Sequence, residues 1–224
     1  MSTSTSKPTA TEAPGSEVNK PTSHPRFYFQ TGDLVFQVEN AIFKVHRHFL
    51  MEHSPVLQDM FSASHLIERS GDGEDDSPAF VLKDDSLRGW ECILSLFYPQ
   101  YALDGILNRK TDDYRNVFQQ PRFTAVEWAS ILRVAHKYLM AAIEIEAMKG
   151  LQEACPPLDM VELMIVAQHV GSDELYNIAL QSLAQRDQML SFEEAEKIGF
   201  EAFYDVTRTE HVYFARTRRE MRWS

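Results

Sequence analysis

Histidine and carboxylate side chains gather in one short segment of the sequence, where they could in principle bind a metal ion. His46, His48 and His53 lie close together, with Glu52 between them. On a helix, His48 and Glu52 would share one face because they are four residues apart. A closed zinc site needs further ligands, and no cysteine stands near this segment. We therefore expect no bound metal, with His46 a structural residue at a strand-to-helix junction and His48 an exposed one.

Other catalytic signatures are missing from the sequence. It contains no nucleophile elbow, no phosphate-binding glycine loop and no H-E-x-x-H motif. The carboxylate pairs Asp84-Asp85 and Glu193-Glu194 stand where helices are predicted to begin, so helix capping explains them. The sequence thus predicts a non-enzymatic protein without catalytic residues or cofactors, and a metal-dependent enzyme is the least favoured alternative.

Composition and charge restrict the class of partner. The formal net charge of -11 argues against broad binding to nucleic acid or to an anionic membrane. The longest apolar run, Leu163 to Ala167, is far shorter than the roughly 20 residues that span a bilayer. We interpret Cys92 and Cys155 as two reduced, buried residues, which indicates an intracellular protein of the cytoplasm, the nucleus or both.

A β-hairpin followed by two short helices is the element that must position the histidines. Apolar residues alternate over 34–38 and again over 42–45, with a break at Asn40-Ala41. From His46 the period becomes helical, and Ser54 and Pro55 begin a second helix as N-cap and first residue. Further strands are predicted over 27–29 and 79–82. Residues 1–24 are rich in Ser, Thr and Pro and are expected to be a disordered tail.

Helices are predicted for most of the remaining sequence. One follows Asp84-Asp85-Ser86, and after an insertion over about 100–123 the next begins at the Thr124–Glu127 capping box. Residues 25–155 are expected to form one domain and residues 156–224 a helical extension, with helices over 158–170, 172–184 and 191–199 and from residue 200 onward. The segment from Arg216 to Arg222 is basic; we interpret it as a solvated helix end, with an acidic partner or nucleic acid as the alternative.

Eight residues of the hairpin and helix segment stand at the spacings of a known signature. An acidic residue opens a strand and is followed by F-x-x-H-x-x-x-L-x-x-x-S-P-x-x-x-x-M-F, in the residues Asp33, Phe43, His46, Leu50, Ser54, Pro55, Met60 and Phe61. This pattern resembles the BTB/POZ domain, and Phe97-Tyr98-Pro99, Trp128 and Gln185-Arg186-Asp187 resemble the type common in basidiomycete fungi. The resemblance covers residues 26–206. It implies an α+β fold, a small sheet flanked by helices, with a core that includes Phe43, His46, Leu50, Ser54, Pro55, Met60 and Phe61.

The same resemblance implies a protein-protein interaction module rather than an enzyme. Leu66 and Glu68 resemble the hydrophobic-x-Glu motif of BTB adaptors for cullin ubiquitin ligases, and residues 158–205 stand where those adaptors carry an extra helical box. A cullin is therefore one expected partner. The alternative is a regulatory scaffold, perhaps associated with transcription.

Two charged residues bear on the scaffold alternative. Asp33 and Arg47 stand where transcription-type BTB proteins form a charged pocket at their dimer face. Asp33 is equally explained as part of the turn after Gly32, and Arg47 as a surface residue. Long-form BTB dimers also carry an apolar helix before the hairpin, and residues 1–24 have no such pattern. We therefore expect a monomer or a weak homodimer.

Overall fold

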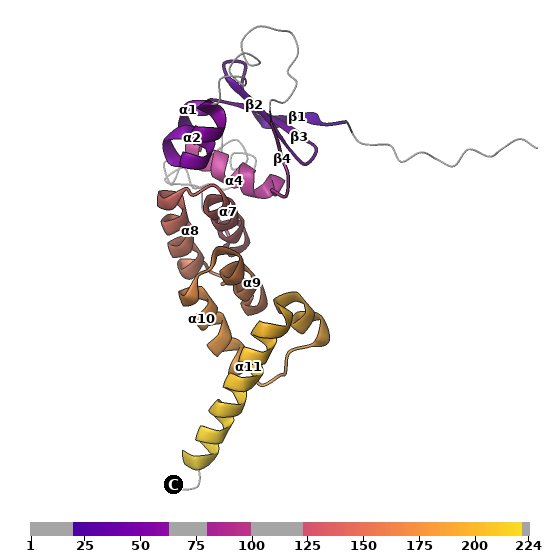
Figure 1. Ribbon diagram of the computed structural model, residues 1–224, viewed down its shortest axis with the longest axis vertical. Helices are drawn as coiled ribbons and strands as arrows, with labels where there is room; N and C mark the ends of the chain where they lie inside the picture. Colours follow the sequence, from indigo (N-terminus) through magenta and orange to yellow (C-terminus); the bar gives the residue numbers. More distant parts are fainter. Residues whose placement is uncertain (1–19, 63–79, 100–122, 221–224) are drawn as a thin grey trace, which may run out of the picture.

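The computed structural model describes residues 20–62, 80–99 and 123–220, with side chains described as far as Tyr213. A four-stranded sheet lies at one end of this part of the chain, and the helices form an elongated stack that leads away from it (Figure 1). The predicted α+β class, with a small sheet flanked by helices and a helical C-terminal part, is confirmed.

The predicted hairpin lies at the centre of the sheet. Strands β2 (Leu34–Val38) and β3 (Ala41–Val45) pair in antiparallel register, with Phe36 opposite Phe43. Burial alternates along both strands, as the apolar pattern requires. The turn falls on Glu39 and Asn40, one residue earlier than predicted, with Glu39 in the left-handed region at φ 51°.

Two parallel strands flank the hairpin and give the sheet order β1-β3-β2-β4. β1 (Thr22–Tyr28) pairs with β3, and β4 (Phe80–Leu82) pairs with β2. The tail predicted over residues 1–24 is therefore too long, since β1 already begins at Thr22. Pro25 obscures the strand in the sequence because it has no N–H, and the register shifts between Ser23 and Tyr28.

The two predicted helices follow the hairpin as α1 (Arg47–His53) and α2 (Pro55–Ser62). The Ser54 hydroxyl caps α2 by accepting from the Leu57 N–H at 3.0 Å, and it donates to the Tyr138 carbonyl oxygen at 2.6 Å. Of the predicted core, Phe43, Leu50, Ser54 and Phe61 are buried, whereas His46 and Met60 are half-buried. Pro55 is exposed, which corrects its assignment to the core, because the first residue of α2 points to solvent.

Three longer helices follow in the described residues of the N-terminal part. They are α4 (Leu87–Phe97), α7 (Ala125–Lys137) and α8 (Ala141–Glu153). Ser86 caps α4, and Thr124 and Glu127 form the predicted capping box of α7. α7 and α8 pack closely where Gly150 meets the Trp128 ring, since a Cβ at Gly150 would overlap that ring.

The C-terminal part consists of α9 (Met160–Val170), α10 (Asp173–Ala184) and α11 (Phe192–Glu220). Gly171, at φ 64°, ends α9, and Gly199, at φ 81°, interrupts α11 where a helix end was predicted. One burial prediction is wrong in this region, since Cys155 is exposed in the turn after α8. On α10, Ile178 is also 43% exposed.

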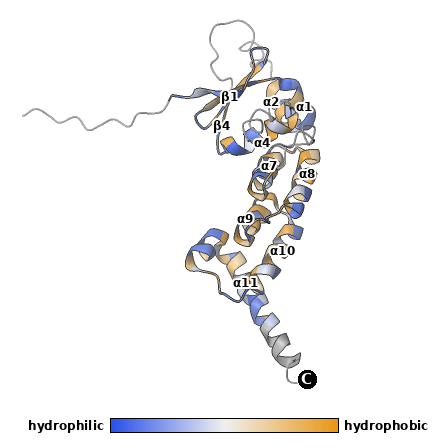
Figure 2. Cartoon of the chain, turned by 180° about the vertical axis from the view of Figure 1, so that it is seen from behind, coloured by the Kyte–Doolittle hydropathy of each residue, from blue (hydrophilic) through white to orange (hydrophobic). Residues whose placement is uncertain are grey.

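The apolar core runs through the whole stack. At the sheet end Phe36 lies between Phe43 and Trp90, with ring centroids 5.1 and 5.0 Å apart. Further along, Ile131, Leu132, Met140 and Met164 are fully buried and belong to the same cluster. Figure 2 shows apolar residues along the strands and along α7 to α10. Within the described residues, none of the helices combines the length and apolarity that crossing a membrane requires.

Candidate partner-binding site

Asp33 and Arg47 meet at the base of the hairpin, where β2 begins and α1 starts. One Asp33 carboxylate oxygen accepts from the Arg47 backbone N–H at 2.8 Å, and the other accepts from Arg47 Nε at 2.7 Å. Because His46, the N-cap residue of α1, makes no side-chain cap, Asp33 supplies that cap from the preceding turn. Asp33 follows the turn in which the Gly32 N–H donates to the Phe29 carbonyl oxygen, and its carboxylate combines a helix cap with a charge pair.

The pair remains in contact with solvent. The side chain of Asp33 is 46% exposed and that of Arg47 is 30% exposed. Partial burial raises the pKa of Asp33. The hydrogen bonds from Arg47 and the positive charge of Arg47 lower it by more, so the pKa of Asp33 lies below its usual value of 3.8. The carboxylate is therefore ionised at neutral pH and offers a charged, half-exposed position to a partner.

His46 lies beside this pair and is held by hydrogen bonds rather than free to ligate a metal. The Tyr98 hydroxyl accepts from the His46 backbone N–H at 3.0 Å and lies 3.1 Å from Nδ1, while Nε2 lies 3.1 Å from the Thr31 hydroxyl. With Nδ1 accepting from Tyr98, the proton of the neutral ring is assigned to Nε2. His46 thus hydrogen-bonds and packs at the junction between β3 and α1.

The other metal candidates do not converge. His48 and Glu52 face each other on α1 with 3.5 Å between Nε2 and Oε2, and both are exposed. No group of three His, Cys, Asp or Glu side chains suited to a metal ion occurs in the described parts of the chain. Between α1 and α4, half-buried rings pack on one another: Phe49 stacks on Phe97 at 6.3 Å, and Phe97 stacks on His53 at 5.0 Å.

A half-exposed charge pair is a group that another protein surface can contact. A family model described as the BTB/POZ domain matches residues 26–154, more than half of the 224-residue chain. The chain belongs to the BTB/POZ family. No curated protein matches the chain. BTB/POZ domains are in general protein-interaction modules, so the expected ligands are proteins, which include further copies of the domain itself.

The BTB match ends one residue after α8, so α9, α10 and α11 lie beyond it. The two residues of the predicted cullin motif, Leu66 and Glu68, fall outside the described residues, and the structure gives them no position. Of the four predicted partner-binding residues, the structure brings Asp33 and Arg47 together.

Asp85 belongs to a buried polar network of the BTB domain. The sequence predicts only a helix-capping role for Asp84-Asp85. One Asp85 oxygen accepts from Trp90 Nε1 at 3.0 Å and from the Tyr138 hydroxyl at 2.5 Å, and the other accepts from Lys137 Nζ at 2.6 Å. Burial and then the bond to Asp85 raise the pKa of Tyr138 above its usual value. No local pattern indicates this network, because Tyr138 is 53 residues from Asp85.

A second buried contact holds β1 of the BTB domain to α4. His24 is 4% exposed and stacks on Phe43 at 4.7 Å. Its Nδ1 accepts from the backbone N–H groups of Arg26 and Phe27, at 3.2 and 3.1 Å, where the strand register shifts. Nε2 therefore carries the proton and donates to the Glu91 carboxylate at 3.0 Å. This hydrogen bond is the main cause that lowers the pKa of Glu91. Partial burial raises the pKa and Arg88 lowers it again, so that the pKa of Glu91 is about 2.

Proposed function

We propose that this BTB protein is a non-catalytic adaptor that links a partner protein to a cullin-type ubiquitin ligase. The observation that supports the proposal best is the way the helical extension is attached. α9 packs directly on α7, and Leu163, Met164 and Ala167 of α9 lie in the same buried cluster as Ile131 and Leu132. Cullin-binding BTB adaptors, which the chain resembles, carry an extra helical box after the domain.

Rigid attachment matters for an adaptor because its two partners must be held at a fixed separation. A shared apolar core resists relative motion more strongly than a polar linker does. A polar contact also joins the two helices, since Arg133 of α7 lies 3.9 Å from Glu162 of α9. The start of α9 itself is capped by Asp159, which accepts from the Val161 N–H at 2.9 Å. An intracellular location, in the cytoplasm, the nucleus or both, is part of the same proposal.

Binding of the purified full-length chain to a recombinant cullin N-terminal domain, measured by calorimetry, tests the proposal. The motif residues are expected to act as interface anchors, and loss of such an anchor costs about 2 kcal/mol, roughly thirtyfold in affinity. Leu66→Ala and Glu68→Lys should therefore abolish measurable binding. Asp75→Asn and Asp76→Asn are the matched controls in the same segment and should change the affinity by well under about 1 kcal/mol. Wild-type protein that binds no cullin would overturn the proposal.

A regulatory scaffold is the second candidate function, and the Asp33–Arg47 pair favours it. In transcription-type BTB proteins these positions contribute to the dimer face, and here the two side chains form an ion pair and are half-exposed. Sedimentation velocity at micromolar concentration separates the two candidates. We expect a monomer or a weak dimer; a tight dimer that Arg47→Glu dissociates would favour the scaffold.

A further inference from the structure

A groove lies between α10 and the second half of α11, at the opposite end of the molecule from the hairpin (Figure 1). It has a volume of about 380 Å³. Leu180 of α10 and Val212 of α11 supply its apolar surface, and Val212 is 62% exposed. An apolar side chain of a partner would cover both residues, which the fold leaves in contact with water.

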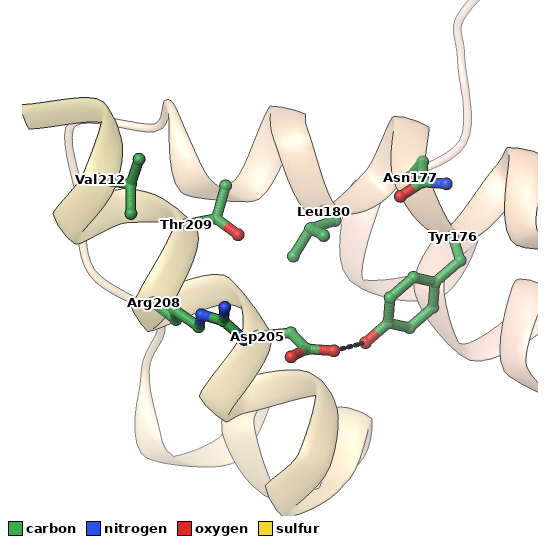
Figure 3. Close-up of a pocket in the computed structure, with 7 residues that line it drawn as sticks. All are labelled: Tyr176, Asn177, Leu180, Asp205, Arg208, Thr209 and Val212. Carbon is green, nitrogen blue, oxygen red and sulfur yellow. Dashed lines mark hydrogen bonds between the residues drawn. The ribbon is translucent and has the colours of Figure 1, made fainter. Parts of the chain in front are cut away.

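One end of the groove is closed by a polar contact. The Tyr176 hydroxyl donates to an Asp205 carboxylate oxygen at 2.9 Å, so α10 and α11 are joined there (Figure 3). Partial burial and then this bond raise the pKa of Tyr176 to about 12, so it remains a neutral donor. Glu201 is also close enough to Tyr176 to contribute to this rise. This end of the groove is therefore negative and already hydrogen-bonded.

The groove also contains a positive charge close to this contact (Figure 3). Arg208 lines the groove one helical turn after Asp205, and within the described parts of the chain no side chain forms an ion pair with it. The residues that α10 contributes to the groove beyond Tyr176 are Asn177 and Leu180, and both are uncharged. Beyond Arg208 the sequence of α11 adds arginines at 216, 218 and 219, although the chain as a whole is acidic.

We propose that this groove binds an acidic, aliphatic segment of a partner protein. An aliphatic side chain lies between Leu180 and Val212, and a neighbouring carboxylate pairs with the Arg208 guanidinium. A carboxylate placed against Asp205 itself would meet like charge, so the carboxylate of the segment contacts Arg208 and not the Tyr176–Asp205 pair. The site goes beyond the proposed cullin contact, because none of the residues that line the groove belongs to the cullin motif at Leu66 and Glu68.

Selection from a phage-displayed library of random peptides on the full-length chain tests this site. Arg208→Glu reverses the charge and Val212→Asp removes the apolar contact; both residues are exposed, so both variants should fold. The matched controls are Lys149→Glu and Ile145→Asp, which make the same kinds of change at exposed positions of α8. Enriched peptides should combine Leu, Ile, Val or Met with Asp or Glu. Each should lose at least about tenfold in affinity for either groove variant and keep its affinity for both controls.

Three results would overturn the assignment. They are enrichment of basic peptides, enriched peptides that bind the groove variants as well as wild type, and no enrichment at all. Self-association of the wild-type chain that Val212→Asp abolishes would instead make the groove a contact between copies, and would equally contradict the proposal. None of these outcomes depends on cullin binding, so failure here and failure of the adaptor proposal are distinguishable.

Discussion

The Tyr138 hydroxyl donates a 2.5 Å hydrogen bond to the buried Asp85 carboxylate, while the Tyr138 carbonyl oxygen accepts from the Ser54 hydroxyl at 2.6 Å. Tyr138 therefore joins three elements of the BTB domain, namely the start of α2, the start of α4 and the end of α7. The signature serine contributes to this junction as well as to its own helix cap.

Asp85→Asn should destabilise the domain strongly. In one orientation the amide NH2 would face the Lys137 ammonium and in the other it would face the Trp90 and Tyr138 donors, and in both Lys137 would lose its carboxylate. We expect a loss of about 2–4 kcal/mol in the free energy of unfolding, measured by urea denaturation. The neighbouring Asp84→Asn is the control: Asp84 is exposed at φ 62°, a conformation that asparagine tolerates, so its effect should stay within about 0.5 kcal/mol. Equal effects of the two substitutions would contradict the network.

Leu50→Ala should also be costly, because Leu50 is the buried residue of α1. Truncation of a buried leucine leaves a cavity and costs about 2–5 kcal/mol, which should appear as a large fall in melting temperature. Ile145→Ala on α8 is the matched aliphatic control, since Ile145 is 69% exposed. A melting temperature for Leu50→Ala close to that of wild type would show that α1 does not pack as described.

The His24–Glu91 contact should make stability depend on acid pH. The pKa of Glu91 falls from its usual 4.5 to about 2 on folding. Its contribution to stability is thus fully present above about pH 4.5 and is lost as the pH falls toward 2. Glu91→Gln should lower the free energy of unfolding by about 1–2 kcal/mol at neutral pH and by progressively less as the solution is acidified. Urea denaturation curves recorded across this range decide the point; a difference that stays constant with pH would contradict it.

Asp33 and Arg47 should differ in what their loss costs. Asp33→Ala removes both the cap of α1 and the charge pair, so we expect a cost of about 1–2 kcal/mol. Arg47→Met keeps the backbone N–H that Asp33 accepts from, and the half-exposed pair alone contributes about 0–1 kcal/mol. Urea denaturation at low and high salt measures how much the cap and the charge pair each contribute to the free energy of unfolding. The pair contribution should shrink with salt and the cap contribution should not; identical costs for the two variants would argue against the cap.

Local patterns in the sequence predict the local structure well. The alternation over β2 and β3, the caps at Ser54, Ser86 and Thr124 and the glycine that ends α9 all depend on neighbouring residues, and the structure has each of them. Pro55 was misplaced because a signature position fixes a residue's helix register and not its burial.

Long-range structure could not be predicted in the same way. The partners of Asp85 and His24 lie 53 and 67 residues away, and nothing near either residue in the sequence indicates them. The predicted strand over 27–29 is shorter than β1 because Pro25 interrupts the alternation of apolar and polar residues. The parallel pairing of β1 with β3 depends on tertiary packing. The groove between α10 and α11 likewise exists only once Gly199 has redirected α11.

The adaptor claim is tested most directly by affinity purification of the full-length chain from its own cells, followed by quantitative mass spectrometry. Wild-type protein should be compared with the Leu66→Ala, Glu68→Lys double variant. We predict that a cullin is recovered with wild type and is depleted at least about tenfold with the variant, because interface anchors dominate such contacts. Recovery of no cullin with wild type, or of equal amounts with both proteins, would contradict the account.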